Sequence, residues 1–413
     1  MPMSSIILLL SDILIFKEIN CYGYHGLIAG NKAISDCLNG EKSKYSDLNM
    51  TPSEFIQENG YPAEDHLILT KDGYLLTLNR IPGPKNAPAV ILQHGYSATS
   101  FDWVILGKKK GLAFLLAKEG YDVWLPNARG GIFSLCHVNY TSSEYSFWDF
   151  SFHEVGMYDL PAVITYISKI IDSDIYFVGH SMGTTSFYIM GVRQPETASK
   201  VKAMYSLAPV AYMNHVRGIT RLVTKLANPV QSLIKKLSAG EINEPGLLQN
   251  LLTQELCGKS LVNKRVCLFF IFSAVGFNYS QVNYTLYPLL FELQSPPSSF
   301  KTAVHYAQII DSKKFREYNY GIIGNLKKYL DLIPPEYDLS KLQVPIGFFW
   351  AENDYYSSPQ DVQRLYDVIP NKILYHKIKD PKFNHIDYIY GTQAPELVYK
   401  ELINAIKNYQ NNK

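Results

Sequence analysis

The feature that most constrains the fold of this 413-residue chain is the stretch 174–183, where a β-branched and aromatic run ends at a serine between two glycines. The run is typical of a buried strand, and residues 184–190 can continue as a helix. A serine at the apex of a strand-to-helix turn takes a strained backbone conformation that exposes its Oγ, and glycines on either side avoid a clash. The pattern predicts a nucleophile elbow with Ser181 at its apex; a flexible Gly/Ser turn is the alternative.

The composition excludes some classes of protein. The chain is 47% hydrophobic and 18% charged, which is enough apolar sequence for a large core. Its 39 Lys and Arg against 37 Asp and Glu leave a formal net charge of +2. Because this charge gives no basic field, we expect no nucleic-acid partner.

Strand and helix patterns alternate on both sides of the elbow. An Asp-Gly turn at 72–73 joins two runs of strand character into an opening hairpin. The strand 89–94 is continuously apolar, as in a parallel sheet buried on both faces. Strands then alternate with helices, so the fold class is α/β with a mostly parallel central sheet and helices on both faces. The predicted strands are 66–70, 74–80, 89–94, 121–125, 175–178, 201–207, 344–350 and 373–378, and the predicted helices are 103–119, 155–171, 360–368 and 396–409.

The alternation stops after Pro209, and this break sets the predicted domain organisation. We expect a signal peptide at 1–23, an N-terminal arm at 24–49, a core formed by 50–210 and 340–413, and an inserted helical cap at 211–339. The predicted cap helices include 222–237, 267–277 and 300–310.

The N-terminus indicates secretory routing. Residues 1–16 are an apolar run too short to span a bilayer, and Lys17 and Glu18 follow it at once. Four N-x-S/T sequons agree with entry into the secretory pathway, because glycosylation occurs only there. The candidate glycosylation sites are Asn49, Asn139, Asn278 and Asn283.

The five cysteines do not make a disulfide scaffold in a chain of this length. If Cys21 leaves with the leader, four remain. A bridge between Cys257 and Cys267 would close a short loop in the cap and is our prediction; buried free thiols are the alternative. The other two cysteines are Cys37 and Cys136.

A serine nucleophile needs a base and an acid that orients the base, and in this kind of fold they follow the serine in the order acid, then histidine. His385 lies in a loop after the last predicted strand, where it can fold back over the elbow. Asp354 follows the strand 344–350 at its carboxyl end, where catalytic groups of open α/β sheets gather. The other candidates are more easily explained as packed or solvated side chains: His376, Asp361, Asp367 and Asp387.

The oxyanion of an acyl-transfer intermediate needs donors already in place. We expect one from the backbone N–H of Met182, at the start of the elbow helix. The second is expected from the backbone N–H of Tyr96, because Gly95 allows the chain to turn close to the substrate after strand 89–94.

Several segments together resemble the acid lipase family, which contains the lysosomal acid and gastric lipases. The resemblance implies an α/β-hydrolase fold, a neutral triacylglycerol or cholesteryl ester substrate at a lipid–water interface, a mobile lid within the cap, no cofactor and no metal. It assigns Ser181, Asp354 and His385 to the triad, Tyr96 and Met182 to the oxyanion hole, and Cys257 with Cys267 to the cap disulfide. The segments are 93–95, 120–125, 127–130, 147–154, 158–162, 179–183 and 383–387.

The chain departs from the family pattern in places. The family usually has Gln at position 182 and Leu at position 96, whereas this chain has Met182 and Tyr96. Both positions act through backbone N–H groups, so the departures concern specificity more than catalysis. Three functions stay open: a monomeric secreted or lysosomal lipase, an esterase for smaller soluble esters, and a catalytically weak lipid-binding or interaction protein.

Overall fold

The computed structural model describes residues 50–222, 224, 240–242, 261–284, 286 and 297–412. The predicted signal peptide and arm lie outside the described residues, as does most of the predicted cap helix 222–237. The domain boundaries therefore stay a prediction.

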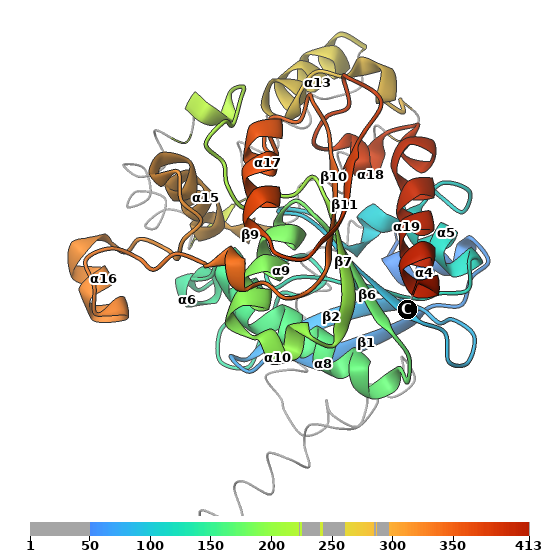
Figure 1. The fold of residues 1–413 in the computed structure, drawn as a ribbon, viewed down its shortest axis with the longest axis horizontal. Helices are drawn as coiled ribbons and strands as arrows, with labels where there is room; N and C mark the ends of the chain where they lie inside the picture. Colours follow the sequence, from blue (N-terminus) through green and yellow to red (C-terminus); the bar gives the residue numbers. More distant parts are fainter. Residues whose placement is uncertain are drawn as a thin grey trace, which may run out of the picture.

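A nine-stranded sheet forms the centre of the molecule, in the order β1-β2-β4-β3-β6-β7-β10-β11, with β5 paired to β2 (Figure 1). The β1–β2 and β2–β4 pairs are antiparallel, and the neighbours from β4 to β11 are parallel. The strands are β1 (Glu64–Leu69), β2 (Tyr74–Ile81), β3 (Ala89–Gln93), β4 (Asp122–Pro126), β5 (Cys136–His137), β6 (Ile175–His180), β7 (Val201–Leu207), β10 (Ile346–Trp350) and β11 (Lys372–Lys377). The predicted mostly parallel sheet is confirmed.

Helices cover both faces of this sheet (Figure 1). Side chains of β6 alternate between the two cores: Phe177 packs on one face and Val178 on the other, as the two-residue period of a strand requires. One face carries α8 (Leu160–Ile170), α9 (Met182–Arg193) and α17 (Pro359–Val368), and the other carries α4 (Pro52–Glu58), α5 (Leu112–Lys118) and α19 (Lys400–Asn411).

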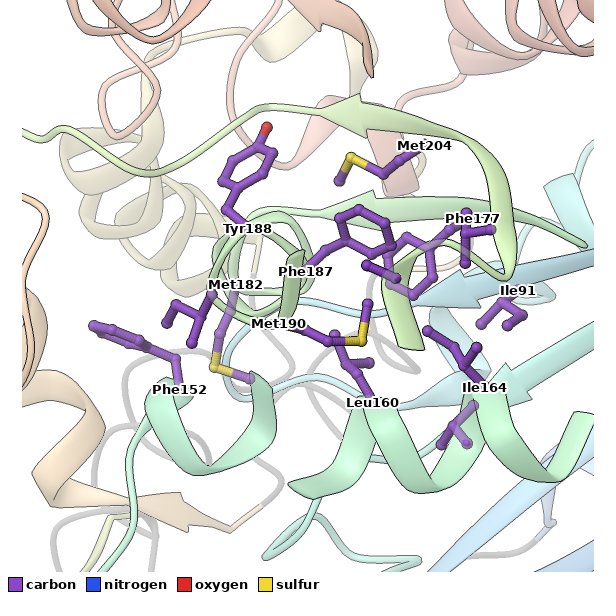
Figure 2. Close-up of a cluster of buried hydrophobic side chains, with 14 of the residues drawn as sticks. Ile91, Phe152, Leu160, Ile164, Phe177, Met182, Phe187, Tyr188, Met190 and Met204 are labelled. Atoms are coloured by element: carbon purple, nitrogen blue, oxygen red, sulfur yellow. The ribbon is translucent and has the colours of Figure 1, made fainter. Parts of the chain in front are cut away.

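The elbow helix α9 is anchored by aromatic and sulfur-containing side chains (Figure 2). Phe187 on α9 lies 4.6 Å from Phe177 on β6, measured between ring centroids, and both are fully buried. Met190, one turn further on, is also fully buried in this core. Burial of each side chain contributes roughly 1.5–3 kcal/mol, so the helix that follows the serine is held firmly against the strand that precedes it.

The segment between β7 and β10 contains short strands and helices and no strand of the main sheet among its described residues. Ser299 fastens it to the core, because its Oγ lies 2.7 and 2.6 Å from the carbonyl oxygens of Trp148 and Phe150, which share its one proton. The described elements are β8 (Glu241–Ile242), α13 (Leu261–Val275), β9 (Ser298–Ser299), α15 (Phe300–Ser312) and α16 (Gly321–Tyr329).

Three helix predictions need correction. The predicted helix 396–409 begins with a π-helical turn, η6 (Pro395–Tyr399), before α19. The predicted helix 103–119 is a 3₁₀ turn, η1 (Ser100–Trp103), and the separate helix α5. Gly107, with φ +74°, and Gly111, which caps α5, lie between these two elements and interrupt the helix. The apolar residues keep a helical spacing across the break, so their pattern alone predicts one continuous helix. The predicted helix 155–171 begins with a π-helical turn, η2 (Val155–Asp159), before α8.

No helix within the described ranges is long and apolar enough to cross a membrane.

Candidate active site

Ser181 stands at a strained turn between β6 and α9, as the sequence predicts. Its φ of 51° and ψ of −114° are rare for a residue with a side chain. A Cβ on Gly179 would lie 2.8 Å from the carbonyl carbon of Gly183, and a Cβ on Gly183 would lie 2.5 Å from the carbonyl oxygen of Gln93. Both positions therefore require glycine, because strand, helix and the neighbouring strand end approach too closely for any other residue.

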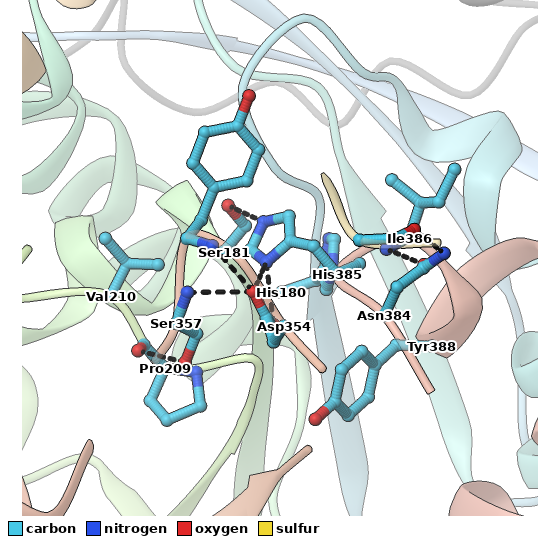
Figure 3. Close-up of polar contacts among 12 residues, drawn as sticks. His180, Ser181, Pro209, Val210, Asp354, Ser357, Asn384, His385, Ile386 and Tyr388 are labelled. Carbon is cyan, nitrogen blue, oxygen red and sulfur yellow. Dashed lines mark hydrogen bonds and ion pairs between the residues drawn. The ribbon is translucent and has the colours of Figure 1, made fainter. Parts of the chain in front are cut away.

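His385 lies within hydrogen-bonding distance of this serine (Figure 3). The distance from His385 Nε2 to Ser181 Oγ is 2.8 Å. The histidine comes from the loop between β11 and α18 (Asp387–Tyr390), 204 residues beyond the serine. This geometry allows the imidazole to accept the hydroxyl proton.

Asp354 completes the series from the loop after β10. Both of its carboxylate oxygens lie 2.9 Å from His385 Nδ1, and the residue is fully buried. Its Oδ1 also accepts backbone N–H bonds from Tyr356 and Ser357, over 2.9 and 2.8 Å. These three donors fix the carboxylate, which in turn fixes the imidazole with Nδ1–H toward the acid and Nε2 toward the serine.

Asp387, the rejected alternative for the acid, contacts its own loop and the segment after α13 instead. Its Oδ2 accepts from the backbone N–H of Asn384 over 2.9 Å and from Nδ2 of Asn278 over 2.8 Å. Burial raises the pKa of Asp387 to about 7. Through its bonds to Asn384 and Asn278, the Asp387 carboxyl holds the loop that carries His385 in place.

The two predicted oxyanion positions adjoin the serine. Met182 is the first residue of α9, and the N–H groups of a first helical turn have no acceptor within the helix. Gly95 brings the other loop close, since a Cβ on it would lie 3.3 Å from Ser181 Cβ. Tyr96 follows, and its hydroxyl donates to the carbonyl of Ser299 over 3.1 Å, which ties the loop to the cap segment.

A cavity of about 730 Å³ opens over these groups. Ser181, His385, Gly95 and Tyr96 line it together with side chains that are mostly apolar. A space of this size and polarity suits an apolar ligand of tens of atoms. The apolar part of the wall is formed by Val210, Met213, Ile219, Ile271, Val275, Phe300, Ala303, Ile310, Ile386 and Ile389.

Two supports of the site were missed from the sequence. His180, between the first glycine and the serine, donates from Nε2 to the carbonyl of His385. The end of α13 joins the two catalytic loops, because the carbonyl of Val275 accepts from the backbone N–H of both Tyr355 and His385, over 3.4 and 3.3 Å. The place of His180 next to the elbow serine could have indicated the first support. No local sequence pattern indicates the contacts of Val275.

The predictions at cysteines fall partly outside the described residues. Cys267 is disulfide-bonded, but Cys257 is not described, so their pairing stays a prediction. Cys136 is disulfide-bonded as well, and nothing in the sequence predicts this bridge.

The sequons differ in accessibility. Asn139 is exposed, Asn283 is half-buried and Asn49 lies outside the described residues. Asn278 is 1% exposed, and its amide donates to Asp387 and to Asp380. Because a glycan on that nitrogen needs access to solvent and would remove these bonds, the structure argues against Asn278 as a glycosylation site.

Across the described part of the chain, no group of three or more His, Cys, Asp or Glu side chains is placed to hold a metal ion.

A nucleophile elbow with a Ser–His–Asp series at the carboxyl ends of parallel strands defines an α/β-hydrolase, and comparisons with known proteins agree. A partial α/β-hydrolase lipase region matches residues 52–107, and the α/β-hydrolase fold matches residues 88–230. Two solved structures share the fold at a TM-score of 0.52. They are a bacterial membrane phospholipase A, 14% identical over 98% of this chain and 99% of that one, and a putative lipase from Acinetobacter baumannii, 12% identical over 89% and 97%.

Curated relatives identify the family. Lipase 3 of Drosophila melanogaster is 33% identical over 93% of this chain and 96% of its own length. Human gastric triacylglycerol lipase is 35% identical over 87% of this chain and 92% of its own length. A putative lysosomal acid lipase/cholesteryl ester hydrolase of Crotalus adamanteus is 33% identical over 87% of this chain and 91% of its own length. The chain belongs to the acid lipase family and is a carboxylic ester hydrolase.

Proposed function

We propose that the chain hydrolyses the ester bonds of neutral lipids, triacylglycerols or cholesteryl esters, through an acyl-enzyme on Ser181. The observation that carries this proposal is the apolar cavity of about 730 Å³ whose wall includes both Ser181 and His385. An ester carbonyl placed at the serine leaves its hydrocarbon chain in apolar surroundings. The names of the relatives, which include triacylglycerol lipase and cholesteryl ester hydrolase, support the same substrate class.

The contacts suggest a residue-by-residue mechanism. Ser181 Oγ attacks the ester carbonyl carbon while His385 Nε2 takes its proton, and Asp354 stabilises the imidazolium that forms. The backbone N–H groups of Met182 and Tyr96 donate to the oxygen that becomes negative. His385 then protonates the leaving alkoxide, and the acyl group stays on the serine.

The second half repeats these roles with water. His385 takes a proton from a water molecule that attacks the acyl carbon, and the tetrahedral intermediate again uses the N–H groups of Met182 and Tyr96. Collapse returns the proton to Ser181 Oγ and releases the fatty acid. Both half-reactions therefore use the same residues, with the alcohol leaving in the first and water attacking in the second.

We further propose that part of the cap moves to admit substrate. An apolar cavity open to water is unfavourable, and a lid hides it until a lipid surface is present. The end of α13 is not that lid, because Val275 is bonded to both catalytic loops. A bridge between Cys257 and Cys267 would stiffen the cap at the middle of this helix, where Cys267 lies.

The finer points of location and assembly are proposals as well. A signal peptide at 1–23 and glycosylation at Asn49, Asn139 or Asn283 fit a protein that is secreted or delivered to lysosomes. A monomer is sufficient, because all three members of the series come from one chain.

Hydrolysis of a graded ester series tests the substrate class. Rates on emulsified trioleoylglycerol and cholesteryl oleate are compared with rates on dissolved p-nitrophenyl butyrate, each across pH. We expect release of oleate and a sharp rise in rate as trioleoylglycerol passes from monomers to emulsion. If only the dissolved short ester is cleaved, the chain is an esterase with a narrowed cap, which is the second candidate function.

A further inference from the structure

A group of large apolar side chains lies exposed on α16 and the turn after it, and none of them lines the active-site cavity. Each of these residues is between 52% and 87% exposed to solvent. In Figure 1, α16 projects at the edge of the molecule, beyond α15 and away from the sheet. The members of this α16 patch are Ile322, Ile323, Leu326, Leu330, Leu332 and Ile333.

The backbone beneath the patch is firmly held, so the exposure does not come from a frayed helix. Asn325 is 1% exposed, and its Nδ2 donates to the carbonyl of Leu332 and to Oδ1 of Asn319, each over 2.8 Å. Its Oδ1 accepts from the backbone N–H of Tyr320 over 2.8 Å. One buried amide therefore ties the start of α16 to the turn that follows its end.

The stability of the folded protein does not explain why a leucine occupies position 330 in the α16 patch. Leu330 caps α16 in the left-handed conformation, with φ 59° and ψ 24°, where glycine or asparagine is favoured. It is also 87% exposed, so its side chain gains little from packing against the protein. A strained and exposed leucine is readily explained if another surface covers it.

The charges around the patch indicate what that surface is. Lys327 and Lys328 are exposed on the same helix, and Asp331 is the one acidic residue between Gly321 and Ile333. Within the described part of the chain, neither lysine forms a salt bridge. Apolar side chains beside basic ones, whose long stems let the ammonium groups reach headgroups, are typical of helices that lie in a lipid interface.

A protein partner fits the patch less well. Each side of a stable protein interface typically contributes about 20–30 residues, whereas this projecting segment offers six apolar side chains and two lysines. Shallow insertion of a few side chains, roughly 5–10 Å into the boundary of headgroups and acyl chains, suits its size.

We propose that the α16 patch is a lipid-docking surface that inserts into a phospholipid layer and keeps the enzyme at the surface from which it draws substrate. It is separate from the exposed apolar residues near the cavity, such as Leu222 and Phe270. The inference rests on the proposed lipase function for its purpose. It can be tested without catalysis.

The test is binding to vesicles by the protein carrying Ser181→Ala, with and without the triple change Ile322→Ser, Ile323→Ser and Leu330→Asn. Asparagine suits the left-handed cap, so the triple variant should fold. The vesicles contain phosphatidylcholine with a fifth of phosphatidylserine, and co-sedimentation gives the partition coefficient. Leu69→Ser, which removes another exposed leucine on β1, is the matched control.

We expect the triple variant to lose at least tenfold in partition coefficient and the Leu69→Ser control to stay within twofold. Lys327→Gln with Lys328→Gln should weaken binding to the phosphatidylserine vesicles more than to pure phosphatidylcholine. Equal binding by the parent and the triple variant overturns the proposal. The proposal is also overturned if the parent protein dimerises in sedimentation equilibrium, the triple variant does not, and both bind vesicles equally. The patch would then be an interface between two copies of the chain.

The same changes in the active enzyme separate this inference from the proposed function. Hydrolysis of dissolved p-nitrophenyl butyrate should stay within twofold in the triple variant, while hydrolysis of trioleoylglycerol on phospholipid-coated emulsions falls about tenfold. A wild-type enzyme that cleaves no lipid ester but still binds vesicles through the patch contradicts the proposed function alone. If the enzyme is active and its rate on emulsions is unchanged by the three substitutions, only the proposed docking surface is contradicted.

Discussion

His180 donates a hydrogen bond from Nε2 to the main-chain carbonyl of His385 over 2.9 Å, so the elbow holds the loop that carries its own base. The two rings lie 5.2 Å apart. Burial lowers the pKa of His180 to about 3, with the neighbouring His385 acting in the same direction. The ring therefore stays neutral beside a base that must become charged during turnover.

This relationship predicts that His180 positions the base. His180→Phe keeps a ring but removes the donor, and kcat should fall by about 10-fold to 100-fold with little change in KM, because a small misplacement of a catalytic group is costly. His180→Gln retains a donor at a similar distance and should recover most of the rate. Steady-state kinetics on p-nitrophenyl butyrate measure both. Equal activity of the Phe variant and the wild type would show that the bond has no role in positioning.

The serine and histidine should act as a unit. Ser181→Ala and His385→Ala should each lower kcat by a factor on the order of 10⁵ to 10⁶, and the double variant should be no worse than either, because each loss alone stops formation of the acyl-enzyme. Circular dichroism and thermal melts check that the variants fold. Losses that multiply in the double variant are incompatible with His385 as the base for Ser181.

The acid can be identified by two matched amide substitutions. Asp354→Asn should lower kcat by about 10⁴, since an amide beside Nδ1 favours the wrong imidazole tautomer. Asp387→Asn should stay within tenfold of wild type, because an amide oxygen can still accept from Asn384 and Asn278. The reverse ranking of the two variants in the same esterase assay would assign the acid role to Asp387.

Asp387 should also make stability depend on pH. Its pKa is raised to about 7 in the folded protein and is near 4 when the chain is unfolded. The stabilising contribution of the protonated carboxyl is therefore complete below about pH 4 and is lost as pH rises toward 7. Asp387→Asn does not titrate, so the difference in unfolding free energy, wild type minus variant, should fall by roughly 3 kcal/mol between pH 4 and pH 7.

Urea unfolding at several pH values between 4 and 7 measures that difference directly. Asp367→Asn, at an exposed carboxylate on α17, is the control and should leave the difference flat. A wild-type advantage over Asp387→Asn that stays constant or grows with pH would contradict the raised pKa.

The sheet and the meeting of the triad residues could be predicted because both follow from local patterns. β3 and β6 are mostly apolar and buried along their whole length, and loops at the carboxyl ends of parallel strands share one edge of a sheet. Ser181, Asp354 and His385 each follow or approach such an end, so their convergence needs no knowledge of side-chain packing.

Other features depend on contacts between distant residues and left no local pattern. The sequon at Asn278 predicts an asparagine on the protein surface, yet its amide is buried against Asp387, 109 residues away. The tie from Val275 to both catalytic loops joins segments separated by about 80 and 110 residues, with no motif at either end. The break between η1 and α5 was missed because the apolar spacing continues across glycines that reverse the chain.

Active-site labelling tests the central claim, that Ser181 attacks long-chain esters, most directly. A long-chain alkylphosphonate ester mimics the substrate and transfers its phosphonyl group to an activated serine hydroxyl. Peptide mass spectrometry should place one phosphonyl group on Ser181, in proportion to the loss of trioleoylglycerol hydrolysis, and Ser181→Ala should take up none. Hydrolysis that persists when Ser181 is fully modified, or a label that tracks the loss of activity from another residue, would contradict the account.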